Sequence, residues 1–285
     1  PAFPRLSGLA SVEEVLDATL PLLEKGARPA DAVNTMNRLK QLTRDRVGRP
    51  GDERLRHAWA LCAAAAVGGV RLMHPKHVSL ALNAMKARGP PLCADGGPGP
   101  EGVFDELYRE AVARARVLLA EEEASGWGSE EGMPAQTLAI ILNALDPGDP
   151  DARPLLVLAS ARLQRLGEGG ADAHSIASIL NAYAALGEWD AALFRRMGAQ
   201  AAALPAAALT LQSVGMVLNS HSRFLQQLST WDVNEGDVAL FAALGARARD
   251  LCGGRPPNNA GVVRSLTLIV NAFAKVGVPD RELFA

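Results

Sequence analysis

Ser175-Ile-Ala-Ser-Ile-Leu-Asn-Ala-Tyr183 decides the fold, because variants of this nine-residue stretch recur along the whole chain. Each variant carries an asparagine at its seventh position, and the first variant is the weakest. The six asparagines are Asn37, Asn83, Asn143, Asn181, Asn219 and Asn271. Their spacings are 46, 60, 38, 38 and 52 residues. The shortest spacing indicates a unit of about 38 residues, and a recurrence in this range is the signature of a repeat array.

Each variant has the pattern of a buried α-helix. In the quoted stretch Ile176, Ile179, Leu180 and Tyr183 occupy positions i, i+3, i+4 and i+7, which is one face of a helix. Small residues recur on a second face and large apolar residues on a third. The small ones are Ala139, Ala177, Gly215 and Thr267, and the large ones are Ile140, Met216 and Leu268. A helix that is apolar nearly all round is buried nearly all round, so we expect inner helices flanked by neighbours.

A more polar helix is predicted after each inner one. The clearest segments are 103–108, 154–159, 188–197 and 237–244. Gly167 and Gly187 stand where C-terminal caps of helices belong. One pair of helices cannot cover its own apolar face, so the pairs must stack. The sequence therefore predicts an all-α protein, in which one α-solenoid of about six helix–turn–helix repeats of roughly 38 residues, with insertions, spans residues 1–285.

The recurring asparagine has two interpretations. Asparagine is a poor helix former, so nothing in the helix itself favours it at that position. In the first interpretation the side chains form a ladder, each amide satisfying a backbone group of the next repeat, since buried polar groups require partners. In the second interpretation the asparagines contact a ligand.

Composition and motifs exclude several classes of function. No run of about 18 apolar residues occurs, so we expect no membrane insertion. The three cysteines are far apart, and His74 and His77 have no third ligand at a metal-site spacing, so no metal site is predicted. No phosphate-binding loop, dinucleotide fingerprint or nucleophile elbow is present. We therefore expect no enzyme activity and no cofactor.

Charge is unevenly distributed along the chain. Residues 1–100 hold 14 Lys/Arg against 9 Asp/Glu, whereas residues 101–200 hold 8 against 16. The densest basic stretch is the connector Arg38, Lys40, Arg44, Arg46, Arg49, Arg54 and Arg56. Arginine binds phosphate well, so this stretch is a candidate RNA contact, although a solvated loop and helix face explains it equally well. The acidic residues near 121–131 favour solvent or a basic protein partner.

The repeats resemble those of organellar helical-repeat proteins. The pattern Ser175-Ile-x-x-Ile-Leu-Asn-Ala-Tyr-Ala-x-Leu-Gly187, followed by Trp189-Asp-x-x-Leu-Phe-x-x-Met197, is similar to the octatricopeptide and heptatricopeptide families and to the FAST-kinase-like proteins. The RAP domain in which such proteins often end is not visible here. The resemblance implies an α-solenoid that binds organellar RNA in a mitochondrion, or less readily a plastid. It also implies a possible place in a protist mitochondrial ribosome.

In helical-repeat proteins that read RNA, each repeat offers a few side chains to one nucleotide. The matching positions here are the first turns of the inner helices, which carry polar, hydrogen-bonding residues in five repeats. These residues are Lys76 and His77, Gln136 and Thr137, His174 and Ser175, Gln212 and Ser213, and Arg264 and Ser265. The alternative is that first turns are polar because they help to cap the helix.

Two functions follow from these patterns. The first is a non-catalytic RNA-binding protein that holds RNA, ribosomal RNA above all, by shape and phosphate contacts within a mitochondrial ribonucleoprotein. The alternative is a protein-binding scaffold in a large assembly without direct RNA contact. Because a repeat array rarely ends on an uncovered apolar face, we expect either more protein beyond Ala285 or a partner that covers this end.

Overall fold

The structure is a computed structural model that describes residues 2–43, 53–86, 102–126, 132–167, 169–228, 233–253 and 260–280. These residues form twelve α-helices, α1 to α12, and three short 3₁₀ helices, and none of them lies in a β-strand. The prediction of an all-α protein is therefore confirmed. Helices that neighbour one another in the chain also pack together in that order.

The chain divides into two compact units, each described here by itself. Unit 1 comprises Pro1–Gly126 and Ala144–Leu155, and unit 2 comprises Trp127–Asn143 and Leu156–Ala285. The chain thus leaves unit 1, returns to it once and leaves again. The prediction of one continuous array over residues 1–285 stays a prediction.

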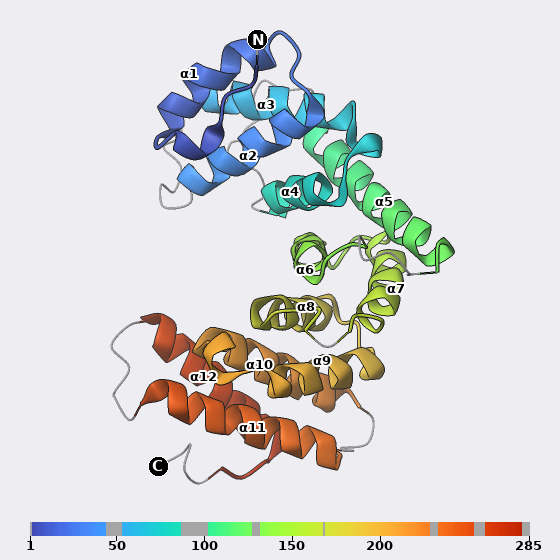
Figure 1. Cartoon of the computed structure of the whole chain (residues 1–285), viewed down its shortest axis with the longest axis vertical. Coiled ribbons are helices and arrows are strands. Elements are labelled where there is room, and N and C mark those ends of the chain that lie inside the picture. The colour runs from blue at the N-terminus through green and yellow to red at the C-terminus, as the bar shows by residue number, and fades with distance from the viewer. Residues whose placement is uncertain are drawn as a thin grey trace. The chain divides into compact units, whose positions relative to one another are not determined.

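Unit 1 is built from five complete helices (Figure 1). They are α1 (Val12–Leu23), α2 (Pro29–Thr43), α3 (Glu53–Val67), α4 (Pro75–Lys86) and α5 (Val103–Ala124). Helices α2 and α4 contain the first two asparagines and pack against each other, while α3 packs on α2 and α5 packs on α4. Helices α3 and α5 are also in contact. The unit is therefore two layers of helices, with α1 lying against α2 and α3.

Unit 2 repeats this arrangement with more helices. They are α6 (Ala135–Ala144), α7 (Ala152–Leu163), α8 (Ala173–Leu186), α9 (Ala191–Ala203), α10 (Leu211–Gln227), α11 (Glu235–Cys252) and α12 (Ala260–Val276). Helix α8 packs on α10 and α10 on α12, and α9 and α11 form a second layer (Figure 1). Helices α6 and α7 each end in one unit and begin in the other.

The inner helices are buried as their sequences predict. In α8 the residues Ile176, Ala177, Ile179 and Leu180 are all completely buried. The hydroxyl of Tyr183, which is also buried, donates to the carbonyl oxygen of Leu156 in α7 at 2.7 Å. This hydrogen bond supplies the one polar atom of the ring with a partner, so the tyrosine packs in the core without leaving a polar group unsatisfied.

Aromatic side chains hold the layers of unit 2 together. Phe194 of α9 stacks on Phe224 of α10 with 4.7 Å between ring centroids. Phe241 of α11 meets Phe273 of α12 edge to face at 5.1 Å. All four rings are buried, and each pair joins an outer helix to an inner one. Aromatic residues are few in this chain, and these two pairs are placed where they tie the two layers together.

Of the two predicted C-terminal caps, one is confirmed and one is wrong. Gly187 ends α8 with φ of 74°, the left-handed conformation that glycine adopts without strain. Gly167 does not cap α7, which ends at Leu163. The chain leaves α7 through a tightened turn, in which the N–H groups of Arg165 and Leu166 donate to carbonyls three residues back. The helix has therefore ended before Gly167 is reached.

The asparagine ladder is present at two junctions between inner helices. In unit 1, Nδ2 of Asn37 donates to the carbonyl oxygen of Leu80 in α4 at 2.7 Å and to that of Val33 in its own helix at 3.1 Å. In unit 2, Nδ2 of Asn143 likewise donates to Ser178 O in α8 at 3.0 Å and to Ala139 O at 2.9 Å. In both cases the acceptor lies three residues before the asparagine of the next repeat.

The contact between α10 and α12 is of a different kind. A Cβ atom on Gly215 would lie 3.0 Å from the carbonyl oxygen of Ser265, so the two backbones approach as closely as glycine allows. The side chain of Asn219 makes no such bond to α12 among the described residues. The small-residue face predicted from the sequence is thus the face that meets the next helix.

Candidate nucleic-acid interface

One position in each repeat stands out at the surface of the inner helices. It lies seven residues before the recurring asparagine, and it is exposed in all five repeats for which a polar residue was predicted there. The residues are Lys76, Gln136, His174, Gln212 and Arg264. We call them the exposed row. In α4, α6, α8 and α10 the position is the second residue of the helix, whereas α12 begins at Ala260, so Arg264 lies one turn further in.

The residue after each of these is less accessible than its neighbour. His77 and Thr137 are half-buried, and the three serines Ser175, Ser213 and Ser265 are buried. The hydroxyl of Ser213 accepts from the N–H of Thr210 at 3.0 Å, and Thr210 Oγ1 accepts from Ser213 N–H at 3.1 Å. These serines therefore cap or back-bond their own helices. The capping interpretation is correct for Ser213, and the exposed row offers one accessible side chain per repeat.

The asparagine ladder aligns two members of the exposed row, Gln136 and His174 of unit 2. Asn143 bonds to the carbonyl three residues before Asn181, which fixes α8 at nearly the same height as α6. Gln136 and His174 are both seven residues before those asparagines, so they lie at the same end of adjacent parallel helices. The ladder interpretation of the asparagines and the exposed row are thus compatible, because the bond that joins the helices also aligns their ends.

The charge on the exposed row is mixed. Lys76 and Arg264 are cations, and the two glutamines are neutral. Beside the row, partial burial, followed by the nearby charges of Lys76 and His74, lowers the pKa of His77. Asp172 at the N-cap of α8 accepts from the N–H of Ser175 at 2.7 Å, and this bond holds the pKa of its carboxyl below the ordinary value. A row of this kind suits hydrogen bonding more than strong electrostatic attraction.

Three of the described cations of the basic connector are engaged inside unit 1. Arg38 donates to the carbonyl oxygen of Leu9, Lys40 donates to the carbonyl and the side-chain oxygen of Asn83, and Arg54 pairs with Asp17 at 2.6 Å. Arg56 is half-buried. Arg44, Arg46 and Arg49 lie outside the described residues. The described cations therefore join α2 and α3 to their surroundings, and phosphate contact by the connector stays a prediction.

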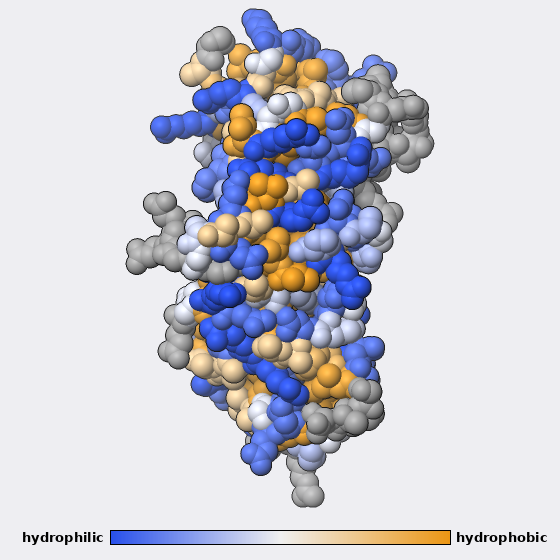
Figure 2. Space-filling model, turned by 90° about the vertical axis from the view of Figure 1, so that its right-hand side faces the viewer, coloured by the Kyte–Doolittle hydropathy of each residue, from blue (hydrophilic) through white to orange (hydrophobic). Residues whose placement is uncertain are grey.

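The face of the protein drawn in Figure 2 is neither uniformly hydrophilic nor uniformly hydrophobic. Figure 2 shows one side, on which hydrophilic residues are interrupted by separate hydrophobic patches. Val117 of α5 and Val157 of α7 are among the exposed hydrophobic residues of the described chain. Scattered apolar residues of this kind are normal on a protein surface and do not by themselves indicate a binding site.

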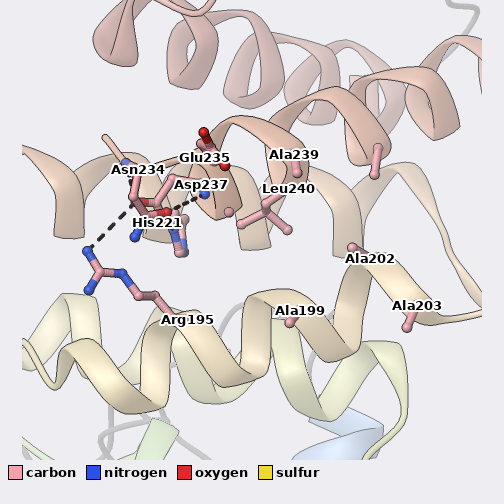
Figure 3. Close-up of a pocket in the computed structure, with 12 residues that line it drawn as sticks. Arg195, Ala199, Ala202, Ala203, His221, Asn234, Glu235, Asp237, Ala239 and Leu240 are labelled. Atoms are coloured by element: carbon pink, nitrogen blue, oxygen red, sulfur yellow. Dashed lines mark hydrogen bonds and ion pairs between the residues drawn. The ribbon is translucent and has the colours of Figure 1, made fainter. Parts of the chain in front are cut away.

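A buried hydrogen bond between His221 and Asp237 lies beside a groove between α9 and α11. The groove has a volume of about 910 Å³, and its walls carry alanines from both helices. Nε2 of His221 lies 2.8 Å from Oδ1 of Asp237, and the guanidinium of Arg195 lies 3.9 Å from the other carboxylate oxygen (Figure 3). His221 and Asp237 are 1% and 2% exposed. The two residues are sixteen positions apart on different helices, so no local motif reveals them.

The pair ties α10 to the start of α11. Burial by itself would raise the pKa of the Asp237 carboxyl, but hydrogen bonds from His221 and from the N–H of Asn234, together with the charge of Arg195, outweigh burial and lower the pKa. The N–H of Asp237 donates to the side chain of Asn234 at 2.9 Å, completing a capping box. The carboxylate is thus saturated with internal partners, which indicates a structural tie between helices.

The described residues hold neither a metal-binding cluster nor a membrane-spanning helix. These residues contain no group of three or more His, Cys, Asp or Glu side chains that could hold a metal ion. None of their helices is long and apolar enough to cross a membrane.

Comparison with protein-family models and with curated proteins finds no match to this chain. The resemblance to the octatricopeptide and heptatricopeptide families therefore rests on the repeat pattern alone.

Proposed function

We propose that this chain is a non-catalytic RNA-binding protein of the α-solenoid type. The observation that carries the proposal is the exposed row, in which one hydrogen-bonding side chain per repeat recurs at a fixed position on successive inner helices. Unstacked RNA bases are recognised through hydrogen bonds to their edges, and helical-repeat proteins supply those bonds from equivalent positions in each repeat. The resemblance to organellar helical-repeat proteins extends the proposal to RNA of a mitochondrial ribonucleoprotein.

Binding of labelled single-stranded RNA to the full chain tests this proposal. The row variant replaces Lys76, Gln136, His174, Gln212 and Arg264 with alanine. A control variant replaces Arg109 of α5 and Arg247 of α11 with alanine, which removes the same number of permanent cations from the outer helices. We expect the row variant to raise Kd at least about tenfold, equivalent to ~1.4 kcal/mol, and the control variant to raise it much less.

Two outcomes would contradict the proposal. If the full chain does not bind single-stranded RNA at 50 mM salt, the assignment is wrong. If both variants weaken binding equally, RNA contacts the surface without using the row. Circular dichroism of each variant confirms that helix content is unchanged, which is expected because all five side chains of the row are exposed.

The second candidate is a protein-binding scaffold. It is favoured by a different observation, the internal use of the described basic residues Arg38, Lys40 and Arg54, which leaves fewer cations for phosphate. In this case the row variant would have no effect, because RNA would not bind. Protein and RNA partners are compatible in one ribonucleoprotein.

A further inference from the structure

Helix α12 exposes a face that the preceding inner helices bury. The position just before the recurring asparagine is Leu180 in α8 and Leu218 in α10, and both are completely buried. The same position in α12 is Val270, which is 37% exposed. Three more residues of this face, Val263, Thr267 and Ala274, are exposed as well. This face of α12 therefore corresponds to the faces through which α8 packs on α10 and α10 packs on α12.

The equivalent faces of α8 and α10 are covered, and they show which kind of element packs on such a face. The face of α10 meets α12 through Gly215, around which the backbone of Ser265 and the side chains of Leu268 and Ile269 are gathered. In both α8–α10 and α10–α12 the occupant is therefore the next inner helix. Continuity with these contacts indicates that an α-helix, running parallel to α12, is the occupant that fits.

The polar group on this face also lacks the partner that Asn37 and Asn143 have in their repeats. Asn271 is exposed and its side chain makes no hydrogen bond to a described residue. Asn37 of α2 and Asn143 of α6 each donate to a backbone carbonyl of the next inner helix. An inner helix packed on α12 would supply an acceptor of the same kind for Asn271.

We propose that the face formed by Val263, Thr267, Val270, Asn271 and Ala274 docks an α-helical hairpin of a partner. The inner helix of that hairpin presents aliphatic side chains to Val263 and Val270, and one of its backbone carbonyls accepts from Nδ2 of Asn271. The proposal concerns unit 2 alone, and it is independent of RNA binding.

An appended hairpin tests the proposal in the full chain. A copy of residues 211–253, which contains α10 and α11, is joined to Ala285 through a flexible glycine–serine linker. We expect the copy to slow amide hydrogen exchange in α12 at least tenfold and to raise the midpoint of thermal unfolding. Val270→Lys in the original α12 should abolish both effects. Val238→Lys, which changes an exposed valine of α11 outside this face, should leave both effects in place.

Any of three other outcomes of this experiment would overturn the proposal. If the appended copy leaves exchange in α12 unchanged, the face does not accept a helix of this chemistry. If instead the unextended chain forms a concentration-dependent dimer that Val270→Lys abolishes, and the copy adds nothing, the occupant is a second molecule of this chain. If Val238→Lys removes the effects as well, the copy acts through another surface.

Discussion

At the scale of single residues, the recurring asparagine is the most informative position in the chain. Its side chain donates twice from the same nitrogen, once to its own helix and once to the next. In unit 1 the oxygen is used too, since Nδ2 of Asn83 donates to Oδ1 of Asn37 at 3.3 Å. Because Asn37 is buried, removing its side chain leaves the carbonyl of Leu80 without this donor.

Replacing Asn37 with alanine should therefore destabilise the protein measurably. We expect the free energy of unfolding to fall by about 1–3 kcal/mol, the cost of leaving buried polar groups unsatisfied. Asn271→Ala is the matched control, because Asn271 occupies the same repeat position but is exposed, and it should change stability by less than about 0.5 kcal/mol. Urea denaturation followed by circular dichroism measures both. Equal losses in the two variants would show that the ladder does not contribute to stability.

Some of these residue roles could be predicted from the sequence, and others could not. The ladder and the exposed positions were predictable, because both repeat with the period of the helices and need no knowledge of tertiary contacts. The partner of Lys40 was not predictable, since its ammonium group contacts Asn83 only after α4 has packed on α2. The same is true of His221 and Asp237, where neither residue has a local signal. A basic stretch in a sequence thus cannot reveal how many of its cations the fold uses internally.

At the scale of elements, neighbouring helices of unit 2 are joined by a few polar side-chain contacts in addition to apolar packing. Between α7 and α9, Ser160 donates to the carboxylate of Asp190, which also caps α9 through the N–H of Leu193. Between α10 and α11, His221 and Asp237 have the equivalent arrangement. In both cases an acidic residue at the start of an outer helix accepts from a side chain of another helix and from its own backbone.

The pair between α10 and α11 predicts a dependence of stability on pH. Since the folded pKa of Asp237 is lowered, its contribution is present above the unfolded pKa of about 4 and is lost as pH falls from there towards the folded pKa. Asp237→Asn should reduce the free energy of unfolding at pH 7 by on the order of 3 kcal/mol, because it breaks a buried pair. The difference from wild type should shrink between about pH 4 and pH 2.

Urea denaturation of both proteins at several pH values checks this expectation. Glu235→Gln is the control, because Glu235 is the exposed acidic residue at the start of the same helix. A difference that stays constant down to pH 2 would show that ionisation of Asp237 does not contribute.

At the scale of the whole molecule, the charge of the chain limits how strongly it can attract RNA. The net charge is −2. Of the described candidates, Arg38, Lys40 and Arg54 are bound within unit 1, and Lys76 and Arg264 are the cations of the exposed row. The remaining basic candidates are the half-buried Arg56 and the three arginines at 44, 46 and 49. We expect any strong dependence of RNA affinity on salt to come mainly from the latter three.

Replacing Arg44, Arg46 and Arg49 together with glutamine should flatten the salt dependence. Each phosphate contact with single-stranded RNA contributes about 0.7 to the slope of log affinity against log salt, so the slope should fall in magnitude by about 2. Fluorescence anisotropy between 50 and 300 mM salt measures it. Substituting Arg109, Arg153 and Arg247 in the same way makes the same change in net charge elsewhere. An equal reduction in that variant would indicate a general effect of charge.

Where the bond from an asparagine to the following inner helix is formed, its acceptor lies near the middle of that helix, at Leu80 of α4 and Ser178 of α8. The distance along the chain from one asparagine to the next varies from 38 to 60 residues. At the two junctions where the bond is formed, alignment is set inside the helices, so a connector need only be long enough to reach. Evolution can therefore lengthen or shorten the connectors of such a protein freely, while a change at the asparagine itself affects two neighbours at once.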